Sequence, residues 1–98
     1  MINVNSTENF ELLTAEEQAQ LVEWCRSLEK SKSINKHHTS YGIKHAFQYG
    51  GGFYVTNGAF KQAMLLAGFD YKPCESGINW RFNVSQKSVA AVRQRRGA

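Results

Sequence analysis

The sequence has no long hydrophobic run and few cysteines. No stretch of about 18 apolar residues occurs, so we expect no membrane-spanning segment. The two cysteines, Cys25 and Cys74, lie far apart and form no C-x-x-C pair, which argues against a disulfide-stapled secreted domain. The first ten residues carry no basic side chain and no apolar core, which is unlike a secretory signal. We therefore expect a cytoplasmic protein with reduced thiols.

The first part of the chain lacks basic residues, and the rest has few acidic ones. Residues 1–25 contain no Lys or Arg, and their five glutamates give them a net charge of −5. Residues 26–98 contain all 12 basic side chains against three acidic ones, a net charge of +9, so the whole chain carries +4. A basic body behind an acidic leading segment favours a partner that carries phosphates or an acidic surface.

No pattern typical of catalysis or metal binding occurs. The histidines His37, His38 and His45 do not have the H-x-x-x-H spacing of a zinc site. The glycines at 50–52 lack the spacing of a phosphate loop, and a strand rather than a helix is expected after them. Cys74 would need a histidine and an orienting group to act as a nucleophile, and the sequence indicates neither. We expect no enzymatic activity, no metal and no cofactor.

Hydrophobic periodicity predicts a folded domain with several helices. A chain of 98 residues with 42% hydrophobic and 12% aromatic residues fits one domain with a small core. Thr14 and Glu17 have the spacing of a capping box, which starts the first helix. The expected helices cover about residues 15–30, 40–48 and 57–67, and a last helix follows Ser85. We expect a single domain over residues 1–98, with a loose N-terminal arm (1–13) and a basic C-terminal tail (93–98).

Short β-forming segments complete the expected fold. Phe53 to Val55 predicts a brief strand, and segments 69–72 and 78–84 predict a hairpin. In the second of these, Ile78, Trp80, Phe82 and Val84 alternate with polar residues, so we expect this apolar set to face the core. The predicted fold is therefore a small α+β domain of three to four helices and a β-hairpin, with a winged-helix-like arrangement as one option.

One candidate binding site lies in the middle of the chain. Thr56 or Asn57 is expected to cap the third helix, and the free amides of a helix N-terminus attract anions. Lys61 follows one turn later, and Lys44 and His45 lie on the preceding helix. Because apolar neighbours fix the inward faces of both helices, we predict that Lys44 and Lys61 point outward and that all four residues line one surface. Simple capping and solvation also explain these residue types.

A second set of candidates lies in the last third of the chain. These residues are the strand residue Arg81 and the tail residues Lys87, Arg93, Arg95 and Arg96. Lys and Arg on a wet strand face and on a tail without acidic residues can neutralise phosphates of a nucleic-acid backbone. A solubilising tail is the other reading of the same residues.

Three segments also resemble a known group of sequences. They are S-Y-G-I-K-H at 40–45, F-Y-V-T-N-G-A-F-K-Q-A at 53–63 and N-W-R-F-N at 79–83. They are similar to the motifs S-Y-G-x-K-H, F-Y-x-T-N-G-x-F-K-x-A and N-W-x-F-N of a family of small uncharacterised proteins of bacteria and mobile elements. The resemblance covers about residues 39–85. It implies a shared fold and a phage or plasmid setting, and it carries over no catalytic residue.

Two functions remain open from the sequence. The charge pattern favours a nucleic-acid-binding domain in which the helix over 40–48 or 57–67 approaches the duplex and the tail holds phosphates. The resemblance implies the alternative, because small proteins of mobile elements often block host defence. In that case the chain is an anti-CRISPR-like inhibitor that binds a host defence protein or nucleoprotein complex, with Tyr41, Tyr49 and Tyr54 as aromatic anchors.

Overall fold

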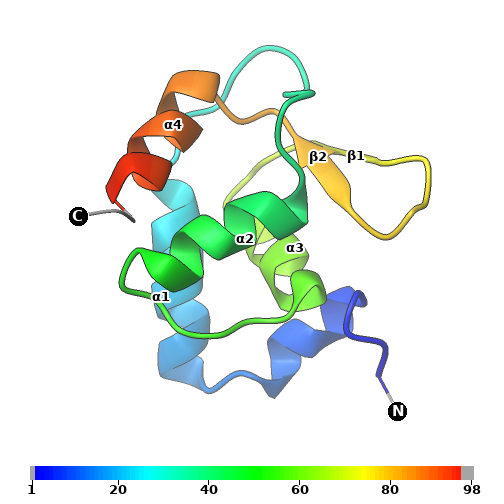
Figure 1. Cartoon of the computed structure of the whole chain (residues 1–98). Coiled ribbons are helices and arrows are strands. Elements are labelled where there is room, and N and C mark those ends of the chain that lie inside the picture. Colours follow the sequence, from blue (N-terminus) through cyan, green and yellow to red (C-terminus); the bar gives the residue numbers. More distant parts are fainter. Residues whose placement is uncertain (1, 96–98) are drawn as a thin grey trace.

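A computed structural model describes residues 2–95 of the chain, and for Arg95 it describes the backbone alone. Within these residues the predicted α+β class is confirmed: helices form the body of the fold, and one small antiparallel hairpin extends from one side of it (Figure 1). In chain order the elements are the 3-10 helix η1 (Thr7–Leu12), α1 (Ala15–Arg26), α2 (Ser40–Tyr49), α3 (Asn57–Leu66), β1 (Tyr71–Pro73), β2 (Trp80–Phe82) and α4 (Gln86–Arg95). None of the helices in this part of the chain is long and apolar enough to cross a membrane.

Local sequence signals set the start of α1 and the end of α3 close to where they were predicted, whereas α1 ends at Arg26 and not near residue 30. The capping box is present, because Thr14 Oγ1 accepts from the Glu17 amide at 3.1 Å and Glu17 Oε1 accepts from the Thr14 amide at 2.9 Å. At the end of α3, Gly68 adopts a φ of 92°, and the Phe69 amide donates to the Met64 carbonyl at 3.1 Å. This is a Schellman ending, and it turns Phe69 back into the core.

Helix α3 is the central element of the fold. It contacts η1, α1 and α2, and Figure 1 shows it lying behind α2 in the middle of the domain. Phe60, Ala63 and Met64 have no exposed surface, as their helical spacing predicted. Burial also extends to the first residues of α3, Asn57 and Gly58, because η1 and the residues before it cover that end. The helix is therefore enclosed on several sides.

The hairpin is present where it was predicted, with shorter strands. Tyr71 pairs with Phe82, Lys72 with Arg81 and Pro73 with Trp80. Phe82 and Val84 are buried as predicted, and Trp80 is half-buried. The prediction is wrong for Ile78, which is 49% exposed. It belongs to the turn between the strands, where strand alternation does not hold.

Two segments differ from the sequence expectations. Residues 53–55 form no strand in the described structure; this extended segment instead buries Val55, whose amide donates to Gln48 Oε1 at 3.1 Å. The N-terminal arm was expected to be loose, but it packs on α3. Its residue Phe10 is buried, and the Val4 carbonyl accepts from the Gly58 amide at 2.9 Å.

Candidate nucleic-acid interface

The predicted outward orientation of Lys44 is wrong. Its side chain is 4% exposed, and Nζ donates to Gln48 Oε1 at 2.8 Å. The ammonium lies 5.1 Å from the Tyr41 ring centroid and 5.3 Å from that of Tyr54. Two aromatic rings therefore cover the charge through cation–π contacts. Burial lowers the pKa of the Lys44 ammonium. The period of a helix gives the direction of a side chain but not what covers it.

Lys61 is covered in a similar way, by the N-terminal arm. It is 2% exposed, its Nζ donates to the Asn5 carbonyl at 3.0 Å, and it lies 4.8 Å from the centroid of the Trp80 ring. Desolvation lowers its pKa. The prediction that Lys61 points outward is therefore also wrong, because residues 4–6 occupy the space that was expected to be solvent.

The N-terminus of α3 is closed rather than open to an anion. Asn57 is buried, and its Nδ2 donates to Asn5 Oδ1 at 3.0 Å, to the Ile78 carbonyl at 3.2 Å and to Asn79 Oδ1 at 3.0 Å. The next amide, that of Gly58, is already bonded to the arm. These contacts join the arm, α3 and the hairpin turn, so Asn57 holds three segments together.

The outer face of α2 is aromatic. His45 is half-buried, with its ring 4.5 Å from that of Tyr41 in an edge-on contact and 5.6 Å from that of Tyr49 in a stacked one. Tyr41 and Tyr49 are both more than half exposed, and Tyr54 beside them is 72% exposed. The four residues predicted to share one exposed basic surface thus do not do so: three are buried and the fourth belongs to an aromatic row.

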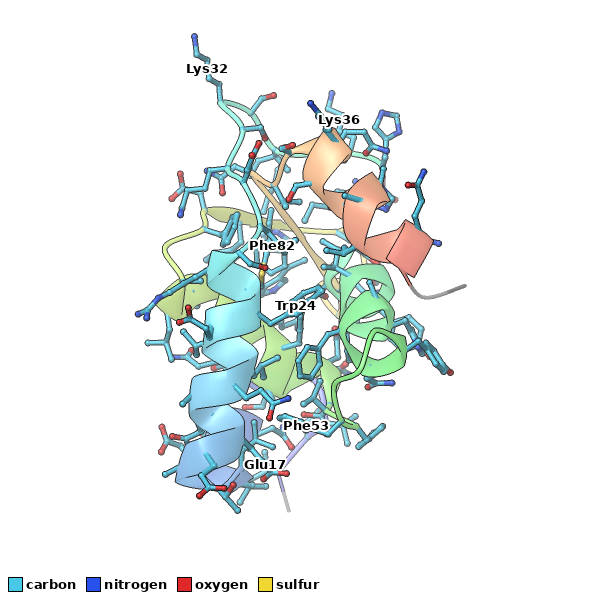
Figure 2. The ribbon with its side chains drawn as sticks, turned by 90° about the vertical axis from the view of Figure 1, so that its left-hand side faces the viewer. Glu17, Trp24, Lys32, Lys36, Phe53 and Phe82 are labelled. Carbon is cyan, nitrogen blue, oxygen red and sulfur yellow. The ribbon has the colours of Figure 1, made fainter. Side chains whose placement is uncertain are left out.

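Basic side chains gather around the second predicted set, on the hairpin and α4, and lysines of the loop 30–38 add to them. Figure 2 shows Lys32 and Lys36 at one end of the molecule and Glu17 at the opposite end. We call the first of these the basic end. It consists of the loop 30–38, the hairpin and α4, and its cationic residues are Lys30, Lys32, Lys36, Lys72, Arg81, Lys87 and Arg93. The acidic residue within these segments is Glu75, and Glu29 and Asp70 directly precede two of them.

Asn35 fixes the loop of the basic end in place. Its amide donates to the Phe82 carbonyl at 2.8 Å, and its Nδ2 donates to the Val84 carbonyl at 3.0 Å. The Asn35 side chain is buried, whereas the neighbouring Ile34 is half-buried. The loop lysines were missed as site residues, and their density in residues 30–36 is the sequence signal that could have identified them. Their proximity to Arg81 depends on the fold and is not visible in the sequence.

The second set of predicted residues lies mostly at this end. Arg81 is on β2, directly opposite Lys72, and Lys87 is exposed in the first turn of α4. Arg93 is exposed later in α4. The backbone of Arg95 ends α4 and nothing is described of its side chain, while Arg96 lies outside the described residues.

His38, the last residue of the loop 30–38, lies close to Gln86 and Arg93 of α4. Burial and then the charge of Arg93 lower its pKa, His37 adds to this, and a contact with Gln86 acts in the opposite direction. Its Nε2 is buried without a hydrogen-bond partner. A base with a lowered pKa in the folded state binds fewer protons there than in the unfolded chain. His38 should therefore cost stability as the pH falls through about 6.5, the ordinary pKa of histidine.

We predict that the melting temperature of the protein falls between pH 7.5 and pH 5.5, and that His38→Gln reduces this fall. The matched control is His37→Gln at the neighbouring, exposed position, which should leave the pH dependence closer to that of the parent. Thermal melts across this pH range measure the effect. Equal pH dependence in the parent and His38→Gln contradicts the prediction.

The described residues hold no group of three or more His, Cys, Asp or Glu that could bind a metal ion. Cys25 and Cys74 are both free thiols; Cys25 is completely buried, which raises its pKa, and Cys74 is half-buried in the hairpin turn. No family model, curated protein or solved structure matches this chain.

Proposed function

We propose that this protein is a non-enzymatic nucleic-acid-binding domain whose basic end contacts backbone phosphates. The observation that carries the proposal is the separation of charge in space. Seven cationic residues gather on the loop, the hairpin and α4, whereas η1 and the start of α1 carry glutamates alone among their charged residues. Such a distribution attracts a polyanion to one end and repels it from the other, so it orients the partner before contact.

The loop and α4 make the phosphate contacts in this proposal. Lys32, Lys36, Lys72 and Lys87 are exposed. Helix α3 cannot enter a groove of a duplex unless the fold opens, because η1, α1 and α2 cover it. The outer face of α2 presents tyrosines and no exposed basic residue. Contacts of lysine with phosphates depend little on base sequence, so binding should be broad in specificity and strongly salt-dependent.

Neutralising two of these lysines tests the proposal. We predict that Lys32→Gln with Lys87→Gln weakens binding to a short duplex equally across unrelated sequences. The slope of log K against log salt should become shallower by about 2, which is about one unit for each lost phosphate contact. Fluorescence anisotropy with a labelled duplex of about 20 base pairs measures both, at salt concentrations between 50 and 200 mM.

The matched control changes the net charge by the same amount at the opposite end. Leu12→Glu with Gln20→Glu adds two negative charges at exposed positions of η1 and α1. It should leave the salt slope unchanged, because no phosphate contact is lost. Equal weakening by both pairs of changes means that overall charge, and not the basic end, determines binding. An unchanged affinity in the Lys32 and Lys87 variant removes these residues from the mechanism.

A second candidate function rests on the exposed tyrosines. Tyr41, Tyr49 and Tyr54 form an aromatic row beside the covered ammonium of Lys44, and exposed aromatic residues often anchor protein interfaces. This row favours the alternative of a phage- or plasmid-encoded inhibitor that binds a host defence protein in the bacterial cytoplasm. Capture from a bacterial lysate with and without nuclease separates the two functions, because a partner bound through the tyrosines stays bound after nuclease and in high salt.

A further inference from the structure

We propose that a hollow at the basic end binds a phosphate monoester, as found at the end of a nucleic-acid strand or on a free nucleotide. The inference rests on the proposed function and names the chemical group that this surface takes most tightly. The hollow has a volume of about 470 Å³ and lies between the loop 30–38 and the hairpin. Its charged lining residues are Lys36, Lys72, Arg81 and Glu75.

Three cations from separate segments converge on this hollow against a single carboxylate. Lys36 comes from the loop, Lys72 from β1 and Arg81 from β2. Within the described part of the chain, no ion pair neutralises any of the three. Lys72 and Arg81 are direct partners across the two strands, and like charges in that position destabilise a hairpin. Bringing these charges together costs free energy, and a bound anion offsets that cost.

Arg81 adds an unsatisfied hydrogen-bond donor. Its Nε is buried and has no hydrogen-bond partner, although its strand neighbours are well bonded. Leaving a buried donor without a partner costs free energy, and more when the donor is charged. The guanidinium group donates bidentate hydrogen bonds to phosphate oxygens, and Lys36 and Lys72 supply further positive charge. The donor set therefore fits an oxyanion with several oxygens.

The walls of the hollow are held in place without a ligand. Asn35, next to Lys36, is bonded to the Phe82 and Val84 carbonyls, which fixes the loop against β2 and the residues after it. On the other side, the Cys74 amide donates to the Asn79 carbonyl at 2.8 Å and closes the hairpin turn. A site that is already ordered loses less entropy on binding than one that must form around its ligand.

The charge of the site favours a monoester over a backbone diester. A terminal phosphate carries a charge of about −1.5 to −2 at neutral pH, whereas each backbone phosphate carries −1. The three cations and one carboxylate that line the hollow give a formal net charge of +2, which balances the charge of a terminal phosphate. The volume lies in the range of small-ligand pockets, roughly 300–1,000 Å³, and leaves room for the attached sugar.

Cys74 is a built-in reporter for this hollow, because it lines it and the other cysteine, Cys25, is fully buried. A thiol reagent added to the native protein should label Cys74, and Cys74→Ser abolishes the signal. We predict that an oligonucleotide with a terminal phosphate, at the 5′ or the 3′ end, slows labelling about tenfold or more. The same oligonucleotide with hydroxyl ends should slow it much less. Equal protection by both oligonucleotides overturns the proposal.

Variants connect the protection to the cations. Lys72→Gln with Arg81→Gln should lower the affinity for the phosphorylated oligonucleotide at least tenfold, because the charge-assisted hydrogen bonds of Arg81 and the charge of Lys72 are both lost, and should reduce its advantage over the hydroxyl form. Lys36→Gln, at an exposed loop position, keeps the test valid if the hairpin variant fails to fold. The control, Lys32→Gln with Lys87→Gln, lies outside the lining of the hollow and should weaken both oligonucleotides alike.

A nucleoside monophosphate separates the two sources of the group. Protection by the free nucleotide at the same concentration as the oligonucleotide assigns the hollow to nucleotides, and protection by the oligonucleotide alone assigns it to strand ends. The two proposals also fail separately. Equal binding of both oligonucleotide forms, weakened by the Lys32 and Lys87 changes, rejects the terminal-phosphate site and supports the nucleic-acid function. Protection by a nucleotide without any binding of oligonucleotides rejects the nucleic-acid function and supports a phosphate-monoester site in the hollow.

Discussion

Replacing Phe82 or Phe60 by alanine should remove a large part of the free energy of unfolding of the protein. Neither ring has any exposed surface, and Trp80 and Trp24 respectively pack edge-on against them at centroid distances of 6.4 and 6.2 Å. Removing a buried phenyl ring costs roughly 3–5 kcal/mol, through lost burial and the cavity left behind. The total stability of a domain of this size is about 5–15 kcal/mol, so either change removes a large part of it.

Chemical denaturation measures this effect, with Tyr54→Ala as the matched control. That change also removes an aromatic ring, but one that is 72% exposed, and it should shift the unfolding midpoint little. Denaturation midpoints of Phe60→Ala and Phe82→Ala that equal the parent value would mean that the core is not where the structure has it.

The second large effect is expected from a substitution that stabilises most helices. Gly58→Ala lies in α3, and an alanine in a helix is usually more stable than a glycine by about 1 kcal/mol. Here a Cβ atom would overlap the backbone carbonyl of Ser6. The arm must move away, and with it go the hydrogen bonds from Gly58 to Val4 and from Lys61 to Asn5. We predict a loss of about 2–5 kcal/mol, from overpacking and unsatisfied donors together.

Gly42→Ala is the control, because there the same substitution should increase the stability and not lower it. Gly42 lies inside α2, and its added Cβ would find Thr39 Oγ1 as its nearest neighbour at 3.9 Å, an ordinary contact. That change should raise the stability by about 0.5–1 kcal/mol. Urea denaturation compares the two variants, and limited proteolysis shows whether the arm has been released. A Gly58→Ala protein as stable as the parent contradicts the close approach of the arm.

The sequence predicted the features that depend on neighbouring residues. The capping box of Thr14 and Glu17 and the glycine ending at Gly68 act within one helical turn, so their residue types are enough to locate them. The alternation that buries Phe82 and Val84 is likewise a local pattern. The hairpin was placed correctly for the same reason. Alternation failed at Ile78, because this residue lies in the turn before β2 begins.

The candidate site was harder to predict because it depends on contacts between distant segments. The burial of Lys61 results from Asn5, 56 residues earlier in the chain, and an arm without hydrophobic periodicity gives no sign of where it lies. The charge asymmetry was visible in the sequence, and Arg81 was identified from it. Its pairing with Lys72 and the approach of Lys36 require the register of the hairpin and the loop anchored by Asn35, neither of which is encoded locally.

The covered ammonium groups of Lys44 and Lys61 have a practical consequence for chemical footprinting. The chain has seven lysines, and the other five, Lys30, Lys32, Lys36, Lys72 and Lys87, are all exposed at the basic end. An amine-reactive reagent applied to the native protein therefore modifies lysine side chains on one face, while the two buried lysines stay unmodified and act as an internal measure of folding. A partner that reduces modification of the five must cover the basic end, whatever its chemical nature.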